Sequence, residues 1–285
     1  MVFYARNFIF DDVPSEEYGL IISSDGSGET NSPGHNVELI TEDIYRRHTP
    51  YFYGVKQADM ITMRASIRTT TGDITAEDSA YIQDWLFGQL AYKELRIVQP
   101  DMEGYYYKCF LLEPEVIRVG NLIVGYDFTI QLDSPFMYGE EITSTINFSY
   151  TSASPQITDT TFLNISDNNY YTYPNFIFEA SGSAYSTYTY LQITNDSDNG
   201  RVFQMGGSSS GSTLNLNEYL IINNDLQSIT SYTGSAMTTE TTDRRIQDLL
   251  NGYFFRSVKG NNDLSIVSSN IKYLTIEYTP LKRMT

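Results

Sequence analysis

The sequence predicts a mainly-β protein of two β-sandwich-type domains, the first of which carries a single helix. Apolar and polar residues alternate strictly over long stretches, which is the period of a half-buried antiparallel strand. Aromatic residues make up 14% of the 285 positions, with 24 Tyr and 15 Phe, and these residues favour strands. At about 150 residues per domain, the length favours two domains.

The composition excludes several classes of protein. The chain has 35 acidic and 18 basic residues, which gives a formal net charge of −17, so neither nucleic acid nor an anionic membrane surface is expected as a partner. One Cys and two His are too few for a disulfide framework or a Cys/His zinc cluster. No signal-like or membrane-spanning apolar run is found, and we expect a soluble protein made in the cytoplasm.

The first half reads as strands around one helix. Thr75-Ala-Glu-Asp78 resembles a capping box and predicts a helix over about 76–91, with Ile82, Trp85, Leu86 and Leu90 on its buried stripe. After residues 115–119, Gly120-Asn121 predicts a hairpin turn into the long alternating run 122–133. The other strands are predicted at 3–10, 18–22, 61–68, 95–99 and 105–112.

The composition changes near residue 140. Sixteen of the thirty residues from 143 to 172 are Ser, Thr or Asn, as expected of a connector. We therefore place one domain at 1–150 and the other at 151–285. A brief helix is predicted near 244–250, and strands are predicted at 175–179, 186–194, 201–205, 213–222, 226–232, 264–267 and 272–279.

No group of residues predicts catalysis, a metal site or a cofactor. Asp196-Ser-Asp-Asn-Gly200 is similar to part of a calcium loop, but the Gly comes one position early and the late Glu is missing, so a turn is favoured. His35 and His48 lie beside no nucleophile motif. Cys109 falls in an alternating run and is expected in the core. A carboxylate pair for glycoside hydrolysis remains open among so many acidic residues.

The order of several short motifs resembles that of phage distal tail proteins, the Dit family of long-tailed phages. The opening Phe8-Ile-Phe-Asp-Asp-Val-Pro-Ser-Glu-Glu-Tyr-Gly-Leu-Ile-Ile22 is similar to the family's start. The helix at 82–86, the strand end Leu132-Asp-Ser-Pro-Phe-Met-Tyr138 and Gly260-Asn-Asn-Asp-Leu-Ser-Ile266 also fit, although Val258-Lys259 replaces the family's Pro. Residues 23–58 depart from the pattern as a longer, more polar loop.

This resemblance implies a structural hub of the tail tip or baseplate, in the virion, synthesised in the bacterial host cytoplasm. The N-terminal domain would close into a ring, usually a hexamer, and the C-terminal domain would be galectin-like. The ring would join the tail tube protein to the tail-tip protein and a receptor-binding protein while DNA passes through. Residues 151–285 contain no Trp or His, so the sugar site of galectins is not expected.

Ring closure requires two complementary faces on each subunit, and Tyr and Phe often anchor such interfaces. The candidate subunit-interface residues are Tyr51, Phe52, Tyr53, Tyr105, Tyr106 and Tyr107, although alternation would turn part of each triplet towards the core. The main alternative is a carbohydrate-binding adhesin or receptor-binding module built of two β-sandwiches. A β-sandwich glycoside hydrolase is a third, more distant reading.

Overall fold

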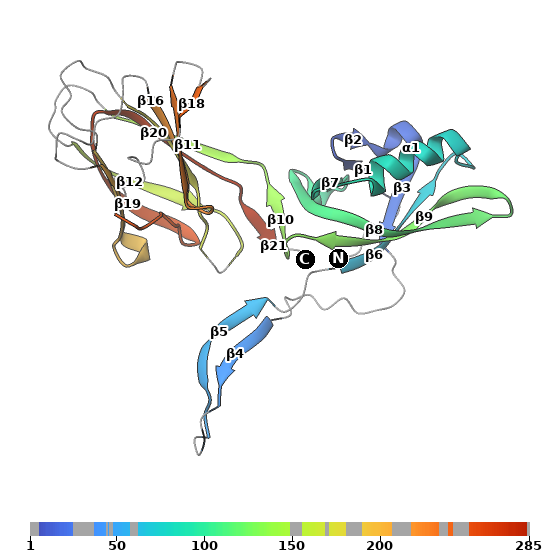
Figure 1. Ribbon diagram of the computed structural model, residues 1–285, viewed down its shortest axis with the longest axis horizontal. Helices are drawn as coiled ribbons and strands as arrows, with labels where there is room; N and C mark the ends of the chain where they lie inside the picture. The colour runs from blue at the N-terminus through green and yellow to red at the C-terminus, as the bar shows by residue number, and fades with distance from the viewer. Residues whose placement is uncertain are drawn as a thin grey trace. The chain divides into compact units, whose positions relative to one another are not determined.

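The computed structural model divides into two compact units. It describes residues 6–24, 37–43, 45, 48–57, 62–148, 156–168, 171–180, 190–206, 218–233, 239–241 and 251–283. The first unit comprises Met1–Gly139 with Lys282–Thr285, and the second comprises Glu140–Leu281 (Figure 1). The predicted helix at 244–250 lies outside the described residues.

One antiparallel sheet with a helix on it forms the first unit. Seven strands follow each other in the order β2-β1-β7-β8-β9-β6-β3, and β10 pairs with both β8 and β21. The strands are β1 (Phe8–Phe10), β2 (Val13–Pro14), β3 (Leu20–Ser24), β6 (Thr62–Thr69), β7 (Lys93–Ile97), β8 (Tyr105–Val119), β9 (Leu122–Leu132), β10 (Phe136–Gly139) and β21 (Leu281–Arg283). Two short 3₁₀ helices are η1 (Ser15–Tyr18) and η2 (Pro100–Met102).

The β8–β9 hairpin confirms the turn predicted at Gly120-Asn121. Val119 pairs with Leu122 across it, and Gly120 has φ +64°, which suits glycine. In β9, Tyr126, Phe128, Ile130 and Leu132 are all buried, as their alternation predicts. Gly125 is required by close packing, because a Cβ there would lie 2.0 Å from the carbonyl oxygen of Ile67 on β6.

Helix α1 (Ala76–Phe87) begins where the capping pattern predicts. The Asp78 N–H donates to Thr75 Oγ1 at 3.1 Å, and Ile82, Trp85 and Leu86 pack into the core. The prediction for Leu90 is wrong, since its side chain is 99% exposed. The helix ends at Phe87, capped by Gly88, so the helical spacing no longer applies three residues later.

Residues 37–42 and 51–57, expected to be part of a polar loop, pair as two strands instead. Strands β4 (Val37–Glu42) and β5 (Tyr51–Gln57) pair antiparallel as a separate two-stranded sheet. The β-branched and aromatic residues of the two strands are typical of β-structure. The surrounding segment is rich in polar residues, so the sequence alone predicted a loop.

A two-sheet sandwich forms the second unit. One sheet has the order β11-β20-β13-β16-β17-β18 and the other β12-β19-β14-β15. Side chains of both sheets share one core, in which Phe176, Leu274 and Ile266 are fully buried. The strands are β11 (Ile142–Asn147), β12 (Gln156–Asn164), β13 (Asn175–Ala180), β14 (Tyr190–Asn195), β15 (Arg201–Gly206), β16 (Glu218–Asn223), β17 (Ser228–Thr233), β18 (Thr239–Thr241), β19 (Gly260–Ser269) and β20 (Ile271–Tyr278), and the 3₁₀ helix η3 is Asp196–Asp198.

The fold class predicted from the sequence, mainly β with two domains and one helix in the first, is confirmed in the described residues. The boundary differs in detail. Strand β11 pairs along its length with β20 of the second unit, so the division lies after Gly139 rather than near residue 150. The chain then returns to the first unit, because β21 pairs with β10.

Candidate interaction surfaces

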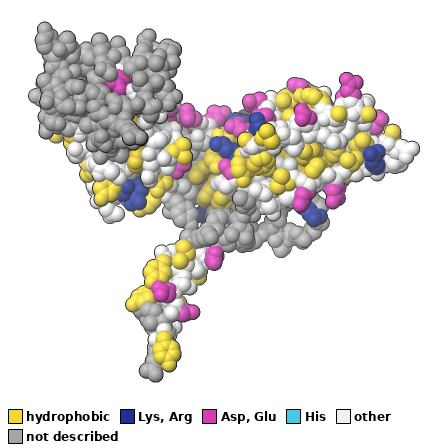
Figure 2. Space-filling view, in the orientation of Figure 1, with side chains coloured by type: hydrophobic (Ala, Val, Ile, Leu, Met, Phe, Trp, Pro, Cys, Tyr) yellow, Lys and Arg dark blue, Asp and Glu magenta, His cyan; other side chains and the backbone are white. Residues whose placement is uncertain are grey.

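The β4–β5 hairpin carries a dense set of exposed apolar side chains. Phe52 is 63% exposed and Tyr53 is 64% exposed. Hydrophobic side chains are visible on the hairpin's surface in Figure 2. The remaining exposed large residues of this segment are Leu39, Ile40, Tyr45 and Tyr51. An isolated two-stranded hairpin is marginally stable in water, and an exposed apolar surface of this kind is typical of interaction sites.

A bulge sets the direction of the hairpin's tyrosines. Ile40 pairs with Gly54 and Thr41 with Phe52, which leaves Tyr53 as the extra residue. The Tyr53 hydroxyl donates to Glu42 Oε2 at 2.6 Å. This hydrogen bond is the main cause of a raised pKa of Tyr53, and burial is the second cause. The rings of Tyr51 and Tyr53 lie 6.5 Å apart. The two rings are therefore held on one strand beside a carboxylate.

The side chains of the second candidate triplet are buried or in contact with other side chains of the same chain. Tyr107 is 3% exposed and lies in the core, so it cannot serve as a subunit contact. Its place on β8 turns it inwards, as strand alternation requires. Tyr106 stacks on Tyr138 at 5.6 Å and lies under the Arg96 guanidinium. The Tyr105 ring has the Lys282 ammonium 4.3 Å from its centre.

Sequence reasoning missed an aromatic pair where η1 meets α1. The rings of Tyr18 and Tyr81 stack at 5.0 Å, and Tyr81 is 48% exposed. The pKa of Tyr18 is raised to about 12, mainly by its hydrogen bond with Tyr81 and secondly by burial. The only signal in the sequence was the position of Tyr81 one residue before the predicted stripe, which does not reveal a partner 63 positions away.

The segment compared with a calcium loop is a turn, as favoured from the sequence. Asn199 and Gly200 both have positive φ after η3. Asp198 is 3% exposed and receives hydrogen bonds from the Arg256 guanidinium at 2.7 and 3.1 Å. That guanidinium also lies 3.5 Å from the Tyr171 ring centre. Asp198 is thus committed to a buried ion pair.

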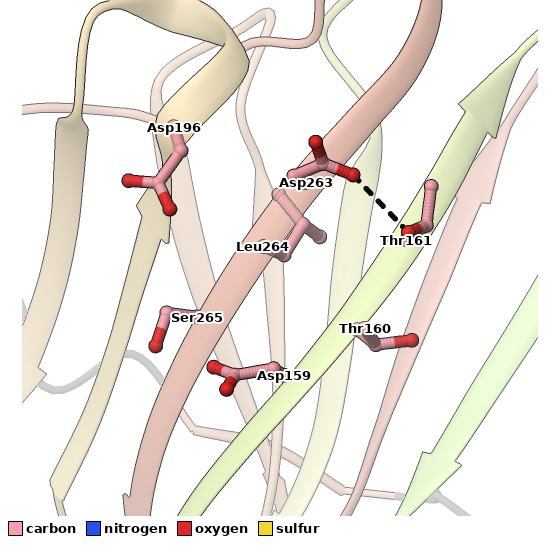
Figure 3. A pocket seen from close by; sticks show the side chains of 7 residues that line it. All are labelled: Asp159, Thr160, Thr161, Asp196, Asp263, Leu264 and Ser265. Carbon is pink, nitrogen blue, oxygen red and sulfur yellow. Dashed lines mark hydrogen bonds between the residues drawn. The ribbon is translucent and has the colours of Figure 1, made fainter.

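A cavity of ≈ 320 Å³ lies on the outer side of β12 and β19, beside η3. Figure 3 shows Asp263 directed at Thr161, whose hydroxyl donates to it at 3.2 Å. The lining consists of Asp159, Thr160, Thr161, Asp196, Asp263, Leu264 and Ser265. No aromatic ring is among these residues. In the part of the chain that the structure describes, no three His, Cys, Asp or Glu side chains are grouped as metal ligands.

The other residues considered for chemistry are not among those that line this cavity. Cys109 is buried in the first unit's core, and burial, together with Asp133, raises the pKa of its thiol. His48 is exposed, and His35 lies outside the described residues. Among those residues, no helix is long and apolar enough to cross a membrane.

Comparison with a protein family shows what the first unit is similar to. Residues 3–134 match the family described as phage tail protein N-terminal domain. These residues make up most of the first unit, which is therefore similar to that family. A comparison with curated protein sequences finds no significant match.

The whole chain has a fold similar to that of a solved tail protein. The SPP1 Dit protein, whose structure is described as a paradigm of the hub adsorption apparatus in phages that infect Gram-positive bacteria, superimposes with a TM-score of 0.62. The match covers 98% of this chain and 99% of that one, at 11% identity. The resemblance to distal tail proteins is therefore confirmed for the fold.

Two structures of the phage p2 baseplate, in its activated conformation with Sr or Ca, are more distantly similar. Their TM-scores are 0.48 and 0.49, at 11% and 9% identity. The matches cover 96% and 99% of this chain, and 98% and 99% of the p2 chains.

Proposed function

We propose that this protein is a non-enzymatic structural hub of a phage tail tip. The observation that carries the proposal is the match of residues 3–134 to phage tail protein N-terminal domains, together with the similarity of the whole chain to the SPP1 Dit fold. In this proposal six copies close into a ring in the virion. The ring joins the tail tube protein to the tail-tip protein and to a receptor-binding protein.

The exposed hairpin supports self-association. In a closed ring each subunit offers two different surfaces, one to each neighbour. The β4–β5 hairpin supplies one such surface through Tyr51, Phe52 and Tyr53, whereas only the outer parts of Tyr105 and Tyr106 remain for contacts. Tyr and Phe give a large contact area at a low cost in side-chain entropy.

The charge of the chain suits a passage for DNA. Six copies carry a formal charge of −102, six times −17. An acidic assembly repels the phosphate backbone and so prevents DNA from adhering to its wall.

The mass of the full chain in solution tests the proposal. A hexamer has a mass of about 194 kDa, six times 32.4 kDa. Native mass spectrometry of the purified protein at micromolar concentration is expected to show this species, and negative-stain images are expected to show rings. A chain that stays monomeric at up to 100 μM would refute ring formation.

The adhesin alternative has less support. The cavity beside β12 is polar, but its lining lacks an aromatic ring to stack on a sugar, and residues 151–285 contain no Trp or His. Glycan-array binding by the full chain, abolished by Asp263→Ala, would favour the adhesin over the hub. Hydrolysis of a polysaccharide would favour the glycosidase.

A further inference from the structure

We propose that the free edge of β12 binds an extended segment of another protein that carries a Lys or Arg opposite Asp159. The segment would add a fifth strand to the sheet β12-β19-β14-β15. This inference concerns the second unit and does not depend on ring formation.

The end strands of the first unit's sheet are protected against such pairing. Natural proteins blunt sheet edges with short strands, prolines, bulges, charges or a covering segment. At one end, β2 has two residues and includes Pro14. At the other end, Arg6 covers β3 by exchanging two backbone hydrogen bonds with Ile22, at 2.9 and 2.8 Å.

In the second unit, the edge opposite β12 is covered as well. The Asn251 backbone N–H donates to the Gln204 carbonyl at 3.1 Å. Its side-chain oxygen accepts from the Gln204 N–H at 3.3 Å, and its amide nitrogen donates to the Val202 carbonyl at 3.2 Å. One asparagine thus substitutes for a neighbouring strand along β15.

The end strands of the six-stranded sheet are less suited to pairing than β12. β18 has three residues. β11 has six, and its Ile142 and Ile146 pack against the core, so the exposed positions in its interior are Thr and Ser.

Among the residues that the structure describes, β12 has none of these protections. Its nine residues pair with β19 in continuous register, without a bulge, and include no Lys, Arg or Pro. Within the described chain β19 is its one strand neighbour. On its outer side Ile157 is 71% exposed and Leu163 is 54% exposed. A long, flat edge with exposed aliphatic side chains is a template for another strand.

The inward side of β12 is also open. Phe162 points into the sandwich and is 5% exposed. Thr158 and Thr160 share its side of the strand but remain half-buried, whereas Leu264 and Ile266 on the paired β19 are buried. The sandwich is therefore not closed along this edge, and an added strand would extend both of its faces.

Acidic side chains decide what kind of strand fits. Asp159 lies on the outer face of β12, and Asp263 and Asp196 line the same cavity (Figure 3). No Lys or Arg occurs between Arg118 and Arg201. Antiparallel pairing of two copies of β12 would bring equal negative charges together, which is unfavourable. Asp159 is the carboxylate on the edge strand itself, so a Lys or Arg of an added strand would lie opposite Asp159, whereas Asp263 lies beyond it on β19.

The test uses the full chain and a capped nine-residue peptide of alternating Val and Lys. We expect binding by fluorescence anisotropy, with slower hydrogen exchange at the amides of Gln156–Asn164. Leu163→Lys is expected to weaken binding by about tenfold, since it adds a like charge on the face of β12 that meets the peptide's Lys side chains. The matched control Leu226→Lys makes the same charge change at a side chain that is 74% exposed in the turn between β16 and β17. It is expected to change binding by less than about twofold, as exposed charges do.

Four outcomes would overturn the proposal. They are the absence of protection at β12 with millimolar peptide, equal losses in both variants, equal binding of a peptide with Glu in place of Lys, and self-association of the chain that Leu163→Lys abolishes. The last would assign the edge to a second copy. None of them depends on whether the chain forms a hexamer.

Discussion

Truncation of Phe52 to Ala is expected to weaken assembly without unfolding the protein. The side chain is 63% exposed on the two-stranded hairpin. A Phe side chain can bury about 200 Å², so about 125 Å² is available to a neighbouring subunit. At about 25 cal/mol per Å², full burial of this area contributes about 3 kcal/mol.

This energy corresponds to a loss of about 100-fold in the affinity of one subunit for the next. Every subunit of a closed ring makes the same contact, so the loss recurs at each interface. The concentration at which half the chains are assembled should therefore rise steeply in Phe52→Ala. Sedimentation velocity between about 0.1 and 100 μM, a range chosen to bracket this shift, measures it.

Leu226→Ala is the matched control. Leu226 is 74% exposed, but it belongs to the second unit, in the turn between β16 and β17, and not to the β4–β5 hairpin. It should leave assembly unchanged. Wild-type assembly by Phe52→Ala, or an equal loss in both variants, would refute the assignment of the hairpin as a subunit contact.

Three further predictions concern stability and reactivity. Trp85→Ala should lower the free energy of unfolding by about 3–5 kcal/mol, because the ring packs in the core and its Nε1 donates to a backbone carbonyl at 3.0 Å, whereas Leu90→Ala should change it by less than about 0.5 kcal/mol in the same denaturant titration. The pKa of Glu277 is raised, mainly by burial and to a smaller extent by the charge of Glu141. The folded state therefore binds the Glu277 proton more tightly than the unfolded state, and the free energy of unfolding falls as the pH rises through that pKa. Glu277→Gln should be slightly more stable than wild type at pH 7 and equal to it below the ordinary glutamate pKa. Cys109 is 0% exposed with a raised thiol pKa, so a thiol reagent at pH 8 should label it only as the first unit unfolds, and rapid labelling of the native protein would contradict its placement in the core.

Local signals in the sequence predict most of the fold. The capping pattern at Thr75 places the start of the helix, and the turn at Gly120-Asn121 places the long hairpin. The end of the helix was predicted too late because Leu90 fits the helical spacing, while Gly88 allows the chain to leave the helix before that residue. The spacing of apolar residues predicts which side of a helix is buried, but the C-cap determines at which residue the helix ends.

The interaction surfaces were only half predictable. The triplet at Tyr51 is exposed and stays a predicted subunit contact, whereas Tyr107 is buried. Alternation warns that one face of any triplet turns inwards, but only pairing with neighbouring strands shows which one. The β12 edge could not be predicted, because the sequence of a strand does not show whether another strand pairs with it on each side.

The motifs that carried the resemblance contain residues that hold the backbone in place. In the opening motif, Ser15 is fully buried and accepts the Phe8 N–H at 3.0 Å, and Gly19 adopts a left-handed conformation (φ +57°) that ends η1. In the late motif, Asn262 is fully buried, accepts the Val258 N–H and donates to the carbonyls of Val258 and Gly260. Each satisfies backbone groups that would otherwise be buried without a partner, which costs about 1–3 kcal/mol per group. Packing positions tolerate many apolar residues of similar size, but these positions accept few substitutes, so short, degenerate motifs in a fixed order are what a shared fold leaves in a diverged sequence.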